Sequence, residues 1–452
     1  MNYRFITMLL IGVGWSSTFG QTRQIEFDEF DLDNGLHVIL HQDNTTPIVN
    51  VSVLYHVGSK NEPDGRKGFA HFFEHLMFEG SPNIERGTFM KIIQNAGGTL
   101  NANTSFDRTF YYETLPSHQL ELGLYMESER MLHATIDSTG VATQKEVVKE
   151  EKRLRVDNQP YGSILAKSFG NAFKGTNYEW TPIGTFEDID AASADDFKDF
   201  FETFYVPNNA TLAIAGDFDK EEAKSLIRKY FDEIPKGKAE IPRPKIAEAT
   251  QAEEIREEVF DNIQLPAVVQ VYRMAKQGSE DYYALEMLTT LLSGGQSARF
   301  QKEIVNNQQI ALQMGAFPFA LEDAGAFIAF GLTNMGRQPE ELEEAIINEI
   351  ERVKTELVGE TEFQKLKNQI ENDFVSRNGR VSGIAESLAD YHVYLGDANL
   401  INSELERYMK VTPEDLMRVA NKYLVEDNRT TLTYLPMAAK KKPADTAVES
   451  DQ

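Results

Sequence analysis

The sequence predicts an α+β fold made of two similar domains, each a largely antiparallel sheet covered by helices. A chain of 452 residues is too long for one ordinary domain. Strand-like and helix-like patterns alternate along its first half, and a tight-turn signal opens that half with a hairpin. Its second half then repeats part of the same order of elements.

The first half has a readable series of elements. Asp33-Asn34-Gly35 is a turn signal between two strand-like runs, Ile25–Leu32 and Leu36–His41, and predicts an antiparallel hairpin. Helices are expected at Gly68–Glu79, Thr88–Asn95, His118–Leu132, Thr143–Val156 and Ala194–Phe204, and strands at Leu100–Asn103, Thr109–Thr114 and Ala210–Ala215.

An internal duplication links the two halves. The run Asp196–Thr211 reads as helix, turn and strand, and the run Asp415–Thr430 repeats that order about 200 residues later. A helix predicted at Tyr282–Leu292 likewise corresponds to the one before Gly80, but it holds no histidine. The second copy therefore cannot bind a metal in the same way.

Composition sets the domain boundaries. Residues 234–257 are rich in Pro, Lys, Glu and Ala and predict a linker. The first domain is then expected over residues 24–233 and the second over 258–437, followed by a disordered tail at 438–452.

The N-terminus predicts export. Met1–Gly20 has one basic residue, an apolar run and then small polar residues, which is typical of a cleaved secretory signal peptide; the alternative is a buried first helix. The apolar run is too short to span a bilayer comfortably, and no later segment offers about 20 uninterrupted apolar residues. We expect a periplasmic or secreted protein without membrane insertion.

The charge and the cysteine content limit the binding partners and the cross-links that the protein can have. The net charge of −26 disfavours nucleic acid and anionic membranes as partners and favours cationic ligands, although much of it belongs to an ordinary solvated surface. The chain has no cysteine, so disulfides are excluded.

The chemistry is concentrated in the run His71-Phe72-Phe73-Glu74-His75. A helical step of about 100° per residue places His71, Glu74 and His75 on one arc and the phenylalanines on the other. Two histidines at this spacing can chelate zinc, and the carboxylate between them can take a proton from a zinc-bound water. The alternative is a pair of buried histidines satisfied by hydrogen bonds.

A catalytic zinc usually has three protein ligands and one open position. Spacing alone does not choose the third. The candidates are Glu113, Glu121, Glu127, Glu129, Glu146, Glu150, Glu151 and His133.

Longer runs carry a resemblance to a known family. They are Asn34–Leu36, Gly58–Glu62, Gly68–Gly80, Gly97–Ala102, Val147–Arg153, Pro207–Thr211 and Gly216–Phe218. Together they resemble the insulinase and pitrilysin family of zinc peptidases, which includes mitochondrial processing peptidase and bacterial two-domain members.

The resemblance implies the site in more detail. It implies Glu151 as the third ligand of one Zn²⁺ per chain and Glu74 as the general base. Family members often have a second glutamate two helical turns before the third ligand, and this chain has Gln144 at that position. Gln144 would not bind the metal itself but could hydrogen-bond one of the residues that do. Asn101, Ala102 and Asn103 match the edge strand to which an extended peptide substrate adds, unless this is an ordinary strand. Phe78 could floor a side-chain pocket, or simply pack.

The resemblance also implies an assembly. Family members enclose a chamber between two such chains, or the halves of one doubled chain, and grip the substrate with an arginine and a tyrosine. Val305 and Leu312 stand at those two positions here. We therefore expect a zinc-dependent endopeptidase that cleaves short or unfolded peptides, with a mild preference for basic ones. A homodimer, or a heterodimer with a similar-sized chain that supplies the arginine and tyrosine, would complete it. The alternative is a non-catalytic or partner-dependent subunit of a two-chain peptidase.

Overall fold

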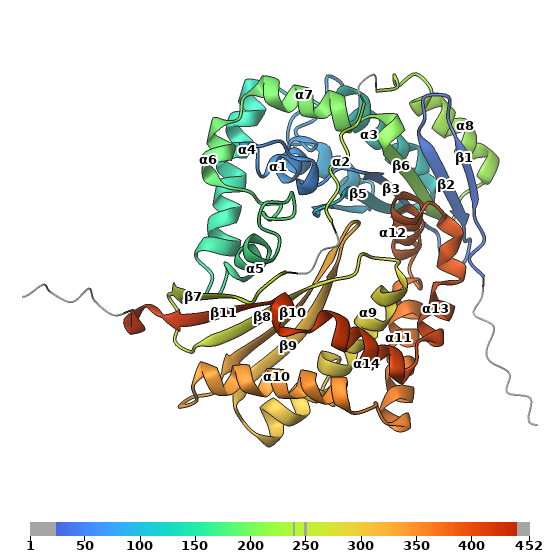
Figure 1. Ribbon diagram of the computed structural model, residues 1–452. Coiled ribbons are helices and arrows are strands. Elements are labelled where there is room, and N and C mark those ends of the chain that lie inside the picture. The colour runs from blue at the N-terminus through green and yellow to red at the C-terminus, as the bar shows by residue number, and fades with distance from the viewer. Residues whose placement is uncertain (1–23, 238–239, 248–250, 441–452) are drawn as a thin grey trace, which may run out of the picture.

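The computed structural model describes residues 24–237, 240–247 and 251–440, which form two halves with one β-sheet each (Figure 1). The strands of the first sheet are β1 (Asp28–Asp31), β2 (His37–Gln42), β3 (Ile48–Tyr55), β4 (Thr99–Thr104), β5 (Thr109–Pro116) and β6 (Ala210–Gly216). Those of the second are β7 (Ile255–Asp261), β8 (Ala267–Met274), β9 (Ala311–Ala320), β10 (Gly325–Thr333) and β11 (Arg429–Pro436).

Helices surround both sheets. The first half contains α1 (Phe69–Leu76), α2 (Phe89–Asn95), α3 (Leu120–His133), α4 (Ser138–Lys152), α5 (Ile164–Ala172), α6 (Phe186–Ala191), α7 (Ala194–Phe204) and α8 (Lys220–Phe231). The second contains α9 (Glu280–Ser293), α10 (Pro339–Thr355), α11 (Glu360–Arg377), α12 (Val381–Asp390), α13 (Glu404–Lys410) and α14 (Pro413–Tyr423). Three π-helical segments matter below: η3 (Arg153–Asp157), η5 (Phe300–Asn307) and η6 (Tyr391–Leu395).

The two sheets share one topology. The first has the order β1-β2-β6-β3-β5-β4 and the second the order β7-β11-β8-β10-β9, so the second reproduces the first without β1. In each sheet one equivalent pair is parallel, β2 with β6 and β7 with β11, and the other neighbours are antiparallel. This confirms the predicted α+β class, and the shared order bears out the duplication read from the sequence.

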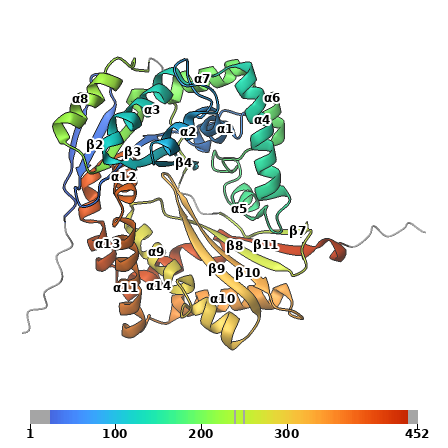
Figure 2. The same ribbon diagram turned by 180° about the vertical axis from the view of Figure 1, so that it is seen from behind.

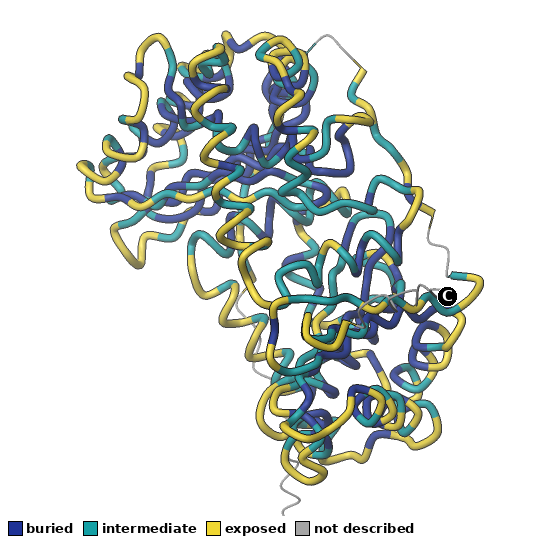
Figure 3. Tube along the Cα trace, turned by 90° about the vertical axis from the view of Figure 1, so that its left-hand side faces the viewer, coloured by how far each residue is buried: buried dark blue, intermediate teal, exposed yellow. Residues whose placement is uncertain are grey.

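Each sheet packs on a helix from the other half. One face of the first sheet buries Ile39, Leu54 and Phe110 against α12, while one face of the second buries Val269 and Ile328 against α5. The opposite faces form the two separate cores beneath the helices of their own half. Figures 2 and 3 show the two layers from behind and from the side, with the buried trace gathered in and around the sheets.

The first core sits between its sheet and the helices above it because the strands alternate. On β3, Val49, Val51 and Val53 face this core, whereas Leu54 faces α12. The sheet is thus buried on both faces, and helix α1 is held over its β4 side.

The predicted elements of the first half all exist, with ends shifted by a few residues; the helix at Ala194–Phe204 is reproduced to the residue. Strand β7 begins at Ile255, inside the stretch predicted as linker, because it pairs in parallel with β11. The predicted signal peptide and nearly all of the predicted tail lie outside the described residues. The first two residues of that tail, Ala438 and Ala439, belong to the 3₁₀ turn Met437–Ala439. Within the described ranges no helix is both long and apolar enough to cross a membrane.

Candidate functional site

Three side chains from two helices converge on one point. His71 and His75 come from α1 and Glu151 from the last turn of α4. Glu151 Oε2 lies 3.7 Å from His71 Nε2 and 3.1 Å from His75 Nε2. One ligand atom from each of the three residues lies within 4.8 Å of the other two, so a single small cation could reach all three.

Aromatic packing determines which face α1 presents. Phe69 and Phe72 both stack on Phe197 of α7, with ring centroids 4.4 Å apart in each pair, and Phe73 stacks on Tyr205 at 4.4 Å. Such pairs each contribute about 0.5–1.5 kcal/mol beyond their buried area. Since the phenylalanines take the core side, the imidazoles and the carboxylate between them are left on the opposite side, as the helical spacing predicted.

A buried carboxylate holds the start of α1. Glu62 accepts the backbone N–H of Gly68 and of Ala70, both at 2.9 Å, and the indole N–H of Trp180 at 2.7 Å. Gly68 has a left-handed backbone and lies against Gly184, where an added Cβ would come 2.4 Å from Gly68 Cα. Burial raises the pKa of Glu62 to about 8 against these three donors. The helix start is therefore fixed on both sides.

Helix α4 is anchored along its length, which brings Glu151 to the histidines. Asp137 caps its first turn, Val148 is fully buried in the first core, and Lys149 Nζ lies 2.8 Å from Asp190 Oδ1 at the end of α6. The π-helical segment η3 begins two residues after Glu151, so Glu151 lies close to the point where the helical geometry changes.

The electrostatics of the site suit a divalent cation. Burial, with the neighbouring His75, lowers the pKa of His71 to about 4, which leaves this imidazole neutral at physiological pH with a lone pair to donate. A hydrogen bond from His75 lowers the pKa of Glu151 despite its partial burial, so the carboxylate is ionised. Two imidazoles and one carboxylate are a zinc donor set of the catalytic kind, with room for a further ligand.

Glu74 differs from Glu151 in its environment. Burial raises the pKa of Glu74, and a hydrogen bond of 2.6 Å from Thr104 Oγ1 to its Oε2 partly offsets this. A carboxyl group with a raised pKa beside a cation site is suited to accepting and returning a proton.

The other residues weighed as third ligand do not join the group of ligand atoms that the described residues form around His71 and His75. Glu150 is exposed and pairs with Arg153 at 3.3 Å. The remaining candidates outside the group are Glu113, Glu121, Glu127, Glu129, Glu146 and His133.

Gln144 reaches a different partner from the one expected. Its Nε2 donates to Glu79 Oε1 at 2.5 Å, and Arg86 Nε holds the other Glu79 oxygen at 2.8 Å. No hydrogen bond joins Gln144 to the three ligands in the described part of the chain, which corrects the predicted contact. The side-chain amide of Gln144 instead binds Glu79, which lies just beyond the end of α1.

The predicted substrate strand lies at an edge. Asn101, Ala102 and Asn103 belong to β4, the last strand of the first sheet, and the exposed Asn101 and Asn103 alternate with the half-buried Ala102. The next inward residue, Thr104, is the one that reaches Glu74. An edge strand and the candidate base are thus joined by one hydrogen bond.

Phe78 is placed for packing. Its ring meets Phe89 edge-on with centroids 5.6 Å apart, and the buried guanidinium of Arg130 lies 4.6 Å from its centroid. It does not line the cavity described next.

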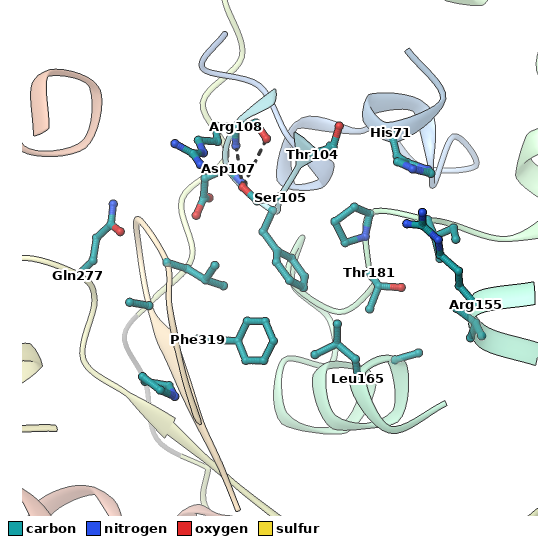
Figure 4. A pocket seen from close by; sticks show the side chains of 18 of the residues that line it. His71, Thr104, Ser105, Asp107, Arg108, Arg155, Leu165, Thr181, Gln277 and Phe319 are labelled. Atoms are coloured by element: carbon teal, nitrogen blue, oxygen red, sulfur yellow. Dashed lines mark hydrogen bonds between the residues drawn. The ribbon is translucent and has the colours of Figure 1, made fainter. Parts of the chain in front are cut away.

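A cavity of about 610 Å³ opens beside the three ligands, between the two halves. Its walls include His71 and Glu151 from the first half and Phe319 and Tyr394 from the second. Figure 4 shows His71 and Arg155 at one end of it and Gln277 at the other. Val305, in η5, packs partly into the second core, and Leu312, on β9, is 58% exposed; neither lines the cavity.

Three residues that support the site were not singled out from the sequence. Thr104 holds Glu74, Glu62 holds the start of α1, and Arg155 Nη1 lies 2.8 Å from Glu151 Oε1, the oxygen turned away from the histidines. Alternation along β4 could have pointed to Thr104. Arg155 lies on a π-helical turn that breaks ordinary helical spacing.

Comparisons with known proteins identify the family of the chain. Residues 37–180 match the family described as "Insulinase (Peptidase family M16)", and residues 191–370 match "Peptidase M16 inactive domain". The zinc protease PqqE of Helicobacter pylori is 32% identical over 434 residues, which cover 95% of this chain and 97% of that one.

Solved structures share the fold. The crystal structure of a protease from Helicobacter pylori superposes with a TM-score of 0.88 at 31% identity, covering 91% of this chain and all of that one. The periplasmic protease PqqL from Escherichia coli shares the fold over 48% of its length, with a TM-score of 0.72 at 19% identity. The chain belongs to the insulinase, or M16, family of peptidases.

Proposed function

We propose that this chain is a zinc-dependent endopeptidase that cleaves short or unfolded peptides. The observation that carries the proposal is the convergence of His71, His75 and Glu151 within 4.8 Å, with Glu74 on the same helix face. A zinc ion held there would polarise the scissile carbonyl and acidify a water molecule.

Glu74 is the proton carrier in this proposal. Thr104 occupies its Oε2, and the described residues form no other hydrogen bond to this carboxylate, so Oε1 can accept a proton from the attacking water. The raised pKa of Glu74 then lets it pass that proton to the leaving nitrogen of the peptide.

The substrate is proposed to bind as an added strand. The open edge of β4 offers backbone groups to an extended peptide, and its last residue, Thr104, lines the cavity beside His71. Because pairing needs an extended backbone, folded proteins would be excluded. The net charge of −26 would favour basic peptides.

A partner chain is part of the proposal. Val305 and Leu312 stand where the family resemblance places a substrate-gripping arginine and tyrosine. In a heterodimer, a second chain of similar size would supply that arginine and tyrosine. A homodimer would have to supply cationic and phenolic groups from other positions, because an identical copy has the same Val305 and Leu312. Without a partner this chain would be a metal-binding but weakly active subunit. Strong cleavage by the purified, monomeric chain would refute the need for a partner.

We further propose that the chain works in the periplasm or is secreted. The signal-peptide pattern of Met1–Gly20 supports this, as does the fold shared with a protein described as a periplasmic protease.

Removal of the proton carrier tests the activity. The zinc-loaded chain and its Glu74→Gln variant are given an internally quenched, unstructured peptide, with the exposed neighbour variant Glu150→Gln as control. A loss of at least about 100-fold in kcat/KM is expected for Glu74→Gln at unchanged zinc content, and near wild-type cleavage for Glu150→Gln. Cleavage that is measurable in wild type and equal in Glu74→Gln would overturn the proposal.

A further inference from the structure

A second group of side chains that could hold a metal ion is separate from the peptidase site and lies where the first hairpin meets the second half. Asp31 of β1 pairs with His37 of β2, and Glu29 lies two residues before Asp31, so the three side chains share one face of the hairpin. That face meets the end of α12 and the π-helical segment η6, which contributes His392.

The His37 ring is oriented as a metal ligand would be. Its Nδ1 lies 2.7 Å from Asp31 Oδ1 and donates to that carboxylate, which leaves Nε2 as the acceptor. Nε2 is buried and has no hydrogen-bond partner among the described residues, yet Glu29 Oε2 lies 3.5 Å away. Two acceptors facing each other in this way call for a cation between them. A carboxylate on the far nitrogen is the usual support of a metal-bound histidine.

His392 completes the group. Its ring stacks on that of His37 with centroids 3.5 Å apart and planes 3° apart. One ligand atom each from Glu29, His37 and His392 lies within 4.8 Å of the others. Ligands of a tetrahedral zinc are about 3.3 Å apart, so the gaps need to close by at most about 1.5 Å. One of the two stacked rings also has to turn on binding, because the lone pairs of parallel rings do not point at the same ion.

We propose that Glu29, His37 and His392 bind a second divalent transition-metal ion of the zinc class, with Asp31 orienting His37. The ion would join the edge hairpin of the first sheet to the second half of the chain. Its ligands span almost the whole sequence, so it would act as a clamp on the docking of the two halves and is independent of catalysis. Imidazole nitrogens with a carboxylate oxygen favour zinc over calcium or magnesium.

Zinc stoichiometry tests this directly. In a His71→Ala/His75→Ala background, which removes the peptidase site, equilibrium dialysis against zinc chloride followed by metal analysis should leave about one zinc per chain. Adding His392→Ala should remove that ion, whereas adding His118→Ala, a change of an exposed histidine in another region, should not.

A second variant and a second readout guard against misfolding. Glu29→Gln preserves shape at a side chain that is 48% exposed, and it should weaken zinc binding by at least about tenfold. Zinc should also raise the Tm of the background protein by about 2 °C or more, and this rise should vanish with Glu29→Gln. A background protein that binds no zinc would overturn the proposal. Zinc retained in full by both Glu29→Gln and His392→Ala would also overturn it. The group would then be only a stacked pair of histidines, His37 and His392, with acidic neighbours.

Discussion

Thr104 Oγ1 donates a hydrogen bond of 2.6 Å to Glu74 Oε2 and so ties the edge strand β4 to the carboxylate between the two histidines. This contact joins the two parts of the proposed enzyme, the strand that would hold the substrate and the group that would move the proton. The hydrogen bond also lowers the pKa of Glu74, because a donor to the charged form favours ionisation of a buried carboxylate.

Removing this donor should slow catalysis without loss of zinc. In Thr104→Val the pKa of Glu74, already raised by burial, rises further, so less of it is ionised at neutral pH. We expect kcat/KM to fall about 3- to 10-fold at pH 7 and the acidic limb of the pH–rate profile to move to higher pH. Thr104→Ser keeps the hydroxyl and should stay near wild type. An unshifted limb with full activity in the valine variant would contradict the assigned role.

The carboxylate at the start of α1 should matter for stability. Glu62 accepts three N–H donors, so Glu62→Gln sets an amide N–H₂ against at least one of them. Above pH 8, where Glu62 is ionised, we expect a loss of about 1–3 kcal/mol in the free energy of unfolding, measured by urea denaturation, and weaker zinc binding because α1 shifts. Glu85→Gln, at a residue whose side chain is exposed, is the control. A glutamine variant as stable as the control would show that the three donors do not need the carboxylate.

The two halves are also joined by a buried cation. Lys60 Nζ lies 3.0 Å from Asp107, 2.5 Å from Glu322 and 3.2 Å from Asp323, and its side chain is only 2% exposed. Lys60→Met leaves these carboxylates facing one another, and about 3–5 kcal/mol of stability should be lost in chemical denaturation.

Lys245 offers a matched control for that change. It pairs with the same two acids of the second half, at 3.8 Å and 3.4 Å, but its side chain is 70% exposed. Lys245→Met should cost less than about 1 kcal/mol because water screens the pair. Similar losses for both lysine variants would mean that burial does not govern the cluster.

Asp281 predicts a pH dependence of stability. Burial by itself would raise the pKa of Asp281, but hydrogen bonds from Lys422, Arg418 and Tyr423 outweigh burial and hold this pKa at about 2. The folded pKa lies below the unfolded value of about 3.9, so the stabilisation is present above pH 4 and is lost as the pH falls toward 2. Wild type should exceed Asp281→Asn by about 2 kcal/mol at pH 7 and by clearly less at pH 3.

Thermal or urea unfolding at the two pH values measures this difference, and Glu280→Gln, an exposed neighbour in the same helical turn, is the control. A difference between wild type and Asp281→Asn that does not change with pH would contradict the assigned cause.

The sequence was enough for the fold class and for the arc of His71, Glu74 and His75, because both follow from local periodicity that tertiary packing then reinforced. The third ligand was different. Spacing could not choose Glu151 among eight candidates, since its position depends on how α4 packs against α1. Gln144 was assigned a contact by analogy, and Glu79 intercepts it in the structure.

The group formed by Glu29, His37 and His392 was even less predictable from the sequence than the third ligand. Glu29 and His37 are near neighbours, and a hairpin predicts that they share a face. His392 lies beside them only because the second half packs on the first, and no local sequence pattern predicts that packing.

The most direct test of the central claim is anomalous diffraction at the zinc edge from crystals grown with zinc chloride. We predict a peak about 2.0–2.2 Å from His71 Nε2, His75 Nε2 and a Glu151 carboxylate oxygen. Ordered His71, His75 and Glu151 side chains with no anomalous density between them would contradict it.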